Sequence, residues 1–168
     1  MKLTAISILL LSLAASSAAA DLVVTFRDGA PKDQFTLTNT GGCATAPIEI
    51  TFDLSPAPAG LIFDISARGA GVEVYQPFEL TYGDGLLVGA SDLSDGDQSL
   101  VLQLSAMAPG DGLSFTIDLD DTAGGREITV SGAEIAGAAV RVNTDGRIAT
   151  GVFDPNGQAL VQLDECIS

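Results

Sequence analysis

The residues best suited to chemistry in this sequence are aspartates, which fall into two groups of three. They are Asp92, Asp95, Asp97, Asp118, Asp120 and Asp121. A hard cation such as calcium takes about six to eight oxygen ligands, which carboxylates, turn carbonyls and water can supply without nitrogen or sulfur. The two groups therefore predict a calcium site, provided that the fold brings them together.

The elements that must position these aspartates are two amphipathic segments, 99–105 and 113–120. Each alternates apolar and polar residues, and a short Pro-Gly-Asp-Gly sequence lies between them. We expect the two segments to form one hairpin with Leu100 opposite Leu119, which places Asp97 near Thr122. Six carboxylates would then crowd one end of the hairpin, and like charges at such distances are destabilising without a cation.

Other interpretations of the aspartates remain open. Asp-Gly sequences favour turns, and Asp118 and Asp120 fit the solvated face of a strand, so the acidic residues could serve solubility alone. The spacing differs from that of an EF-hand loop. Paired carboxylates could also hydrolyse glycosides, but such a site needs a cleft and a buried carboxyl, whereas these aspartates are expected to be exposed.

The composition excludes several classes of function. The chain of 168 residues has no His, which excludes histidine general bases, Ser-His-Asp systems and His-ligated zinc or haem. Its formal net charge of -15 excludes electrostatic binding to nucleic acid or to an anionic membrane surface. Ring stacking on sugars has little support, because Trp is absent and only Tyr75 and Tyr82 could serve.

The N-terminus has the pattern of a secretory signal peptide over residues 1–20. Lys2 gives a short positive region, an apolar run follows over 6–13, and Ala18 to Ala20 form a small-residue cleavage site. We expect cleavage before Asp21 and a secreted or periplasmic protein. The apolar run is too short to span a membrane, and no longer one follows.

Two cysteines, Cys43 and Cys166, lie in the part of the chain that would be exported. An oxidising compartment favours their pairing, so we expect one disulfide between them. Two buried free thiols are the alternative.

The rest of the sequence predicts an all-β fold for a single domain over 21–168. Strand-like alternation recurs in short segments separated by Asp-Gly, Gly-Gly and Asn-Gly turns, as in 48–54. This pattern favours an antiparallel, immunoglobulin-like β-sandwich with a C-terminal β-hairpin over 147–164. No long amphipathic helix is indicated.

Four segments carry a resemblance to a known family: TNTGGCATAPIEITFDLSPAPAGLIFDI (38–65), GAGVEVYQPFEL (69–80), SDGDQSLVLQLSAMAPGDGLSFTIDLDDT (94–122) and REITVSGAEIAGAAVRV (126–142). Over most of 21–142 the chain resembles secreted bacterial proteins named after the aggregation factor core protein of marine sponges. The resemblance implies an extracellular, non-enzymatic adhesion or surface-associated role. With the calcium site predicted from the aspartates, we expect a calcium-assisted module whose partner is an extracellular protein or polysaccharide. A metal-free structural domain is the main alternative, and a glycoside-acting enzyme is a remote one.

Overall fold

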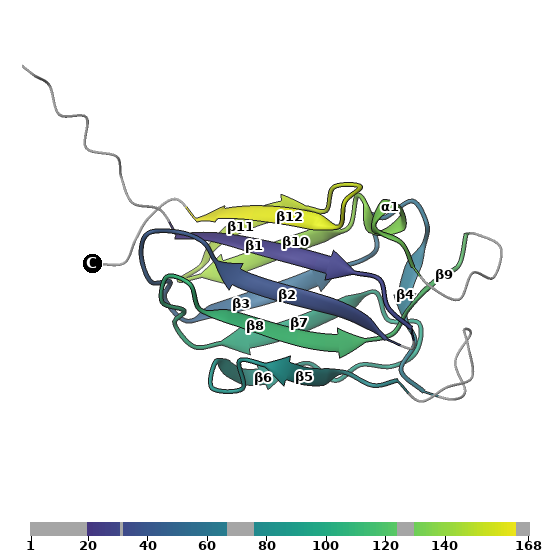
Figure 1. Cartoon of the computed structure of the whole chain (residues 1–168), viewed down its shortest axis with the longest axis horizontal. Helices are drawn as coiled ribbons and strands as arrows, with labels where there is room; N and C mark the ends of the chain where they lie inside the picture. The colour runs from purple at the N-terminus through teal and green to yellow at the C-terminus, as the bar shows by residue number, and fades with distance from the viewer. Residues whose placement is uncertain (1–19, 31, 67–75, 124–129, 164–168) are drawn as a thin grey trace, which may run out of the picture.

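The computed structural model describes residues 20–30, 32–66, 76–123 and 130–163. The expected signal peptide and Cys166 lie wholly or almost wholly outside these ranges, as do two segments whose alternation predicts strands, 72–75 and 126–130. Two antiparallel sheets of five strands pack face to face, which confirms the predicted all-β antiparallel sandwich (Figure 1). The immunoglobulin-like assignment is finer than this arrangement and stays a prediction.

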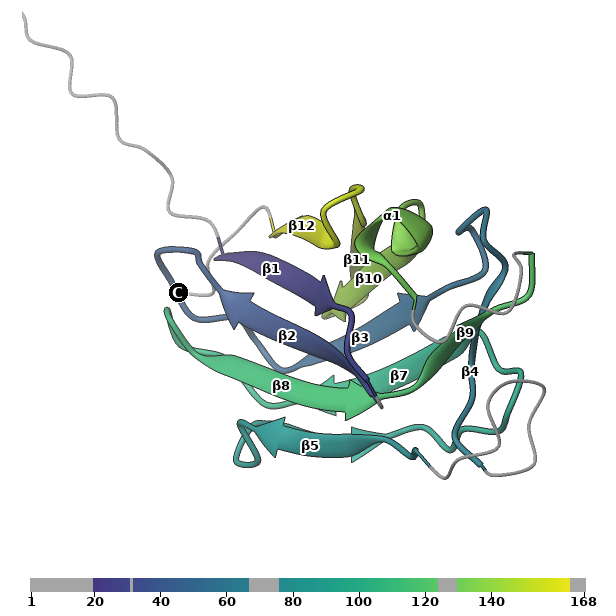
Figure 2. The same cartoon turned by 45° about the vertical axis from the view of Figure 1, so that its right-hand side comes forward.

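The first sheet has the order β12-β1-β2-β8-β5 and the second has the order β11-β10-β3-β7-β6. The strands of the first sheet are β12 (Gln158–Leu163), β1 (Ala20–Arg27), β2 (Asp33–Asn39), β8 (Gly112–Ile117) and β5 (Glu79–Tyr82). Those of the second are β11 (Arg147–Val152), β10 (Ala139–Thr144), β3 (Ile48–Asp53), β7 (Ser99–Leu104) and β6 (Leu87–Ala90). A separate ribbon of β4 (Leu61–Phe63) and β9 (Leu119–Asp121) lies at one end (Figure 2).

The core lies between the sheets, because alternate residues of each strand point inward. In β2 and β3 the burial follows this period closely. Phe35 stacks on Phe115 of the neighbouring strand at 5.1 Å and meets Phe52 of the opposite sheet edge to face at 5.3 Å. These aromatic contacts join the two layers, and the short helix α1 (Gly132–Ile135) adds Ile135 to the core.

The expected hairpin of 99–105 with 113–120 is wrong. β7 pairs with β3 and β6, whereas β8 pairs with β2 and β5, so the two segments lie in opposite sheets. Leu100 lies opposite Phe52 and not Leu119. The loop between them crosses the end of the sandwich, with Met107 buried and its N–H donated to Thr45 Oγ1 at 3.0 Å. Two strands with apolar inner faces can pack across a core as readily as side by side.

The expected C-terminal hairpin over 147–164 is also divided between the sheets. β11 pairs with β10, and β12 pairs with β1, although the chain does reverse between them. The hairpin nearest the C-terminus is instead β10–β11, closed by Asp145 and Gly146 with φ values of 50° and 80°. Two consecutive positive φ values produce the turn that matches the twist of a two-stranded ribbon.

Candidate metal centre

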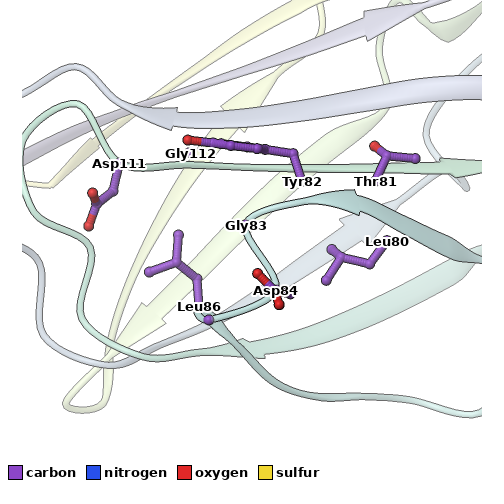
Figure 3. A pocket seen from close by; sticks show the side chains of 9 residues that line it. Leu80, Thr81, Tyr82, Gly83, Asp84, Leu86, Asp111 and Gly112 are labelled. Carbon is purple, nitrogen blue, oxygen red and sulfur yellow. The ribbon is translucent and has the colours of Figure 1, made fainter.

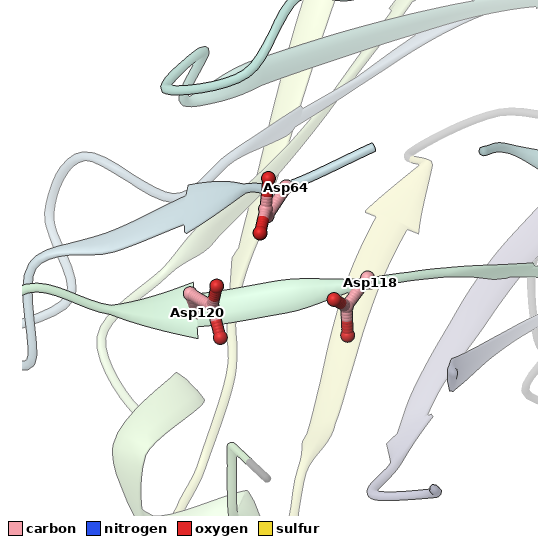
Figure 4. A group of neighbouring side chains, drawn as sticks. All are labelled: Asp64, Asp118 and Asp120. Atoms are coloured by element: carbon pink, nitrogen blue, oxygen red, sulfur yellow. The ribbon is translucent and has the colours of Figure 1, made fainter. Parts of the chain in front are cut away.

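The candidate site lies on the β4–β9 ribbon, which continues β8 beyond Ile117. Phe63 pairs with Leu119, and the register extends one step further because the Asp64 N–H donates to the Asp118 carbonyl at 3.2 Å. Residues two apart on a strand share a face, so Asp118 and Asp120 lie together, and Asp64 lies across from Asp118. Figure 4 shows the Asp64 carboxylate pointing toward the strand that carries the other two.

The three carboxylates form a compact and buried cluster. One oxygen from each of Asp64, Asp118 and Asp120 lies within 4.8 Å of the others. Among the residues that the structure describes, this is the one group of three acidic or other metal-ligating side chains at such distances. The exposed fractions of these residues are 0%, 8% and 9%. Neither carboxylate oxygen of Asp64 has a hydrogen-bond partner, and nor has Oδ2 of Asp120. Buried carboxylate oxygens without donors are costly, so the site requires protons or a cation.

The pKa values of the clustered aspartates also indicate that the site requires protons or a cation. Burial, followed by the nearby Asp120 carboxylate, raises the pKa of Asp64 from 3.8 to about 6. Burial also raises the pKa of Asp118 to about 7, and the charges of Asp120 and Asp64 add to this effect. The charge of Lys32 offsets only part of this rise in the pKa of Asp118, and the Lys32 ammonium is already bound to the Glu79 carboxylate at 3.0 Å. The described residues therefore leave the cluster short of positive charge.

Two further aspartates hold the backbone around the cluster. Asp33 is buried and accepts hydrogen bonds from the Gly29 and Leu119 N–H groups, both at 3.2 Å, so it fixes the segment between Asp118 and Asp120. Burial raises the pKa of Asp33 to about 8 despite these two bonds.

On the other side, Asp95 binds the segment that follows Asp64. Its Oδ1 accepts the N–H groups of Ile65 at 2.8 Å and Ser66 at 2.9 Å, and its Oδ2 accepts the Ser66 hydroxyl. The Ser66 hydroxyl and the Ile65 N–H lower the pKa of Asp95, which therefore stays ionised beside the cluster.

The structure brings together only some of the aspartates singled out in the sequence. Asp118 and Asp120 belong to the cluster, and both are buried where exposed side chains were expected. Asp92 and Asp97 are exposed, and Asp97 Oδ2 accepts the Ser94 N–H at 2.7 Å. Asp121 is half-buried on β9. As the residue next to Asp120 on the strand, it lies on the opposite face.

The sequence analysis missed Asp64 and Asp33, although each carries a recognisable signal. Asp64 lies in the apolar segment Leu-Ile-Phe-Asp-Ile, where a lone charged residue continues a buried strand. Asp33 is in phase with the inward residues Phe35 and Leu37 of β2. An ionisable residue at a core position of a strand is expected to have a partner or a perturbed pKa.

The arrangement can bind a hard divalent cation. Two oxygens bound to one calcium ion at about 2.4 Å lie at most about 4.8 Å apart, so the spacing of the cluster is compatible with calcium. Three carboxylates would supply part of the coordination, and backbone carbonyls or water the remainder.

Comparison with known proteins gives no relative for this chain. No family model, curated protein or solved structure matches it.

Proposed function

We propose that this chain is an exported, non-enzymatic adhesion or surface-associated module whose fold is stabilised by calcium bound at Asp64, Asp118 and Asp120. The observation that carries the proposal is Asp64, which is fully buried with both carboxylate oxygens lacking a partner and directed at two further carboxylates. A cation offsets this cluster, because the described residues offer it little positive charge.

Export and adhesion are inferred from the sequence. The signal-peptide pattern over residues 1–20 supports a secreted or periplasmic location. The sequence resemblance over 21–142 supports an adhesion role with an extracellular protein or polysaccharide as partner. Within the described residues, no helix is long and apolar enough to cross a membrane.

A disulfide between Cys43 and Cys166 is part of the proposal. The Thr40 N–H donates to the Asp21 carbonyl at 2.8 Å, and the first residue of β1 pairs with Leu163. The loop that contains Cys43 and the end of β12 therefore lie at the same end of the first sheet. Cys166 follows Leu163 by three residues, which can extend about 10 Å, and this reach supports the proposed pairing.

The alternatives receive less support from the geometry. A glycosidase needs two carboxyl groups on either side of a substrate, about 5 to 9.5 Å apart. The cluster has its oxygens within 4.8 Å and is almost entirely buried, which leaves little room for a sugar between them. A metal-free structural domain would have to keep the cluster protonated at neutral pH.

Calorimetric titration of the chelator-stripped mature protein with calcium tests the proposed function. We expect one site with a Kd in the range of about 10⁻⁴ to 10⁻³ M, as is common in extracellular modules. Asp118→Asn should abolish the binding, whereas Asp92→Asn, at an exposed position outside the cluster, should preserve it. Absence of binding at several millimolar calcium, or equal binding by both variants, would contradict the calcium site.

Adhesion is tested separately with latex beads coated with the mature protein and mixed in turn with soluble polysaccharides. We expect the beads to aggregate in calcium and to disperse in chelator, and beads coated with Asp118→Asn should stay dispersed in both. Dispersed beads under all conditions, with calcium binding intact, would contradict the adhesion role alone.

A further inference from the structure

The edge of the first sheet carries an exposed aromatic ring beside a cavity. Residues two apart on a strand normally share a face, but a shift in register between Leu80 and Tyr82 places them on opposite sides of β5. Leu80 packs against the core, whereas Tyr82 is 67% exposed. Tyr82 also lines a cavity of about 500 Å³ together with the turn from Gly83 to Leu86 and the start of β8 (Figure 3).

The backbone around Tyr82 is shaped by glycines. Gly83 has φ +81°, and a Cβ there would lie 2.4 Å from the Gly112 carbonyl oxygen, so only glycine allows this close approach. A Cβ at Gly112 would lie 3.8 Å from the Tyr82 ring, which therefore rests over the bare backbone of β8. The ring is thus held along the sheet and stays open to a ligand.

Polar groups surround the same cavity. The Asp111 carboxylate is held in place because its Oδ2 accepts the Ala108 N–H at 2.8 Å, and Asp84 is exposed on the turn. Carboxylates accept strong hydrogen bonds from hydroxyl groups, whereas an aromatic face contacts C–H surfaces. A cavity of this size, with one aromatic wall and a few fixed acceptors, is of the kind that binds a small polar ligand or one unit of a polymer.

The outer face of the first sheet continues from Tyr82 as a row of uncharged polar side chains. The register places these residues side by side across all five strands: Tyr82, Ser114, Thr36, Thr25 and Gln158. Ser114 is buried, and its Oγ lies 2.9 Å from Thr36 Oγ1, so the solvent-accessible part of the row is Tyr82, Thr36, Thr25 and Gln158. The adjacent row on one side, with Thr38 and Val23, is also uncharged, whereas the adjacent row on the other side carries Glu79 and Arg27. In a chain with a net charge of -15, the first two rows are free of carboxylates.

We infer that this face, from Tyr82 and its cavity across the row of Thr36, Thr25 and Gln158, binds a neutral polysaccharide. One sugar ring packs on Tyr82 with its hydroxyl groups donating to Asp84 and Asp111, and the following units lie along the hydroxyl and amide row. The inference specifies the partner and rests on the proposed surface-binding role, but it does not depend on the calcium site.

Other occupants fit the face less well. An anionic polymer would meet the carboxylates of Asp84 and Asp111 at the cavity, which repel it. A second copy of the chain adding a strand to the β5 edge would meet the irregular register between Leu80 and Tyr82, which interrupts regular pairing. A neutral ligand rich in hydroxyl groups satisfies both the cavity and the row.

Native gels cast with polysaccharides test the inference. The probes are dextran, a mixed-linkage β-glucan, a galactomannan and a xylan as neutral polymers, with alginate as the anionic one, each in calcium and in chelator. We expect at least one neutral polymer to retard the mature protein and alginate to leave it unretarded. Tyr82→Ala should weaken binding by about tenfold or more, Tyr82→Phe should largely keep it, and Ile148→Ala, 68% exposed on the other sheet, should leave it unchanged.

A second readout locates the contact. The chain has no Trp and only Tyr75 and Tyr82, so Tyr75→Phe leaves Tyr82 as the single fluorophore of this kind. Its emission should change when the retarding polymer is added. No retardation by any neutral polymer, equal retardation of Tyr82→Ala and parent, stronger retardation by alginate, or unchanged emission would each overturn the inference. Calcium titration of the same samples shows independently whether the proposed cation site has failed.

Discussion

Replacing Asp64 by Asn should stabilise the protein in chelator and remove most of its stabilisation by calcium. In chelator, the parent at pH 8 holds an ionised carboxylate that burial and Asp120 disfavour. The pKa of Asp64 is raised from 3.8 to about 6. This shift corresponds to at most about 3 kcal/mol of destabilisation above pH 6. Asn is neutral and of similar size, so the variant should be more stable than the parent by up to this amount.

With calcium the difference should close. At a free concentration about 100 times the Kd, binding stabilises the folded parent by about 2.7 kcal/mol. For a domain of this size that is a rise in Tm of about 5 to 10 °C. Asp64→Asn removes one of the three carboxylates of the cluster, so most of the rise should disappear. The two melting curves should therefore lie well apart in chelator and close together in calcium.

Thermal melts followed by circular dichroism at pH 8 decide the matter, with sodium chloride added to equalise ionic strength. Asp92→Asn is the matched control, because it removes the same charge at an exposed position outside the cluster. It should keep the full calcium response of the parent. The reasoning fails if the parent melts equally in chelator and calcium, or if Asp64→Asn gains as much from calcium as the parent does.

Three other predictions follow from the same structure. Burial raises the pKa of Asp33 to about 8 and that of Asp118 to about 7, so the calcium-free native state binds protons that the unfolded chain releases above about 3.8. Urea unfolding in chelator should therefore show stability rising as the pH falls from about 8 to about 4, and flat stability would contradict both shifts. Gly83→Ala should destabilise the fold by more than about 1 kcal/mol in urea, because of its positive φ and the 2.4 Å approach of the adjacent strand. Alkylation of the unreduced exported protein should label neither Cys43 nor Cys166, and mass spectrometry that finds two labelled thiols would remove the disulfide.

Local alternation in the sequence predicts most strands, because it depends only on which face of each segment is buried. The segments 48–54 and 99–105 correspond closely to β3 and β7. The short strand β6 has no such alternation, since Leu87 and Val88 are followed by Gly89 and Ala90. Alternation says which face is buried but not which strand lies alongside. The pairing of β7 and β8 with other strands therefore could not be obtained from it.

The candidate site depends on which strands pair with each other, and alternation in the sequence does not show this. Asp118 and Asp120 could be selected from their spacing alone, because residues two apart share one face of a strand. Asp64 joins them only through the pairing of β4 with β9, which links residues more than fifty positions apart in the chain. Asp92 and Asp97 were grouped with Asp118 through a hairpin that does not form. The sequence also suggested solvated side chains, because it does not show what covers a strand at the end of a sandwich.

Strand β8 connects the two proposed sites, one of which would contact the partner while the other would stabilise the fold. It begins at Gly112 beneath the Tyr82 ring and leads after Ile117 into Asp118, so the sites lie about 20 Å apart along one strand. At the Tyr82 end, the bare backbone of β8 and the bulge in β5 leave the ring open to solvent. At the other end, the β4–β9 ribbon is joined by only a few pairs and carries buried like charges. We propose that calcium offsets those charges and so stabilises the scaffold, while the neutral rows of the sheet contact the partner.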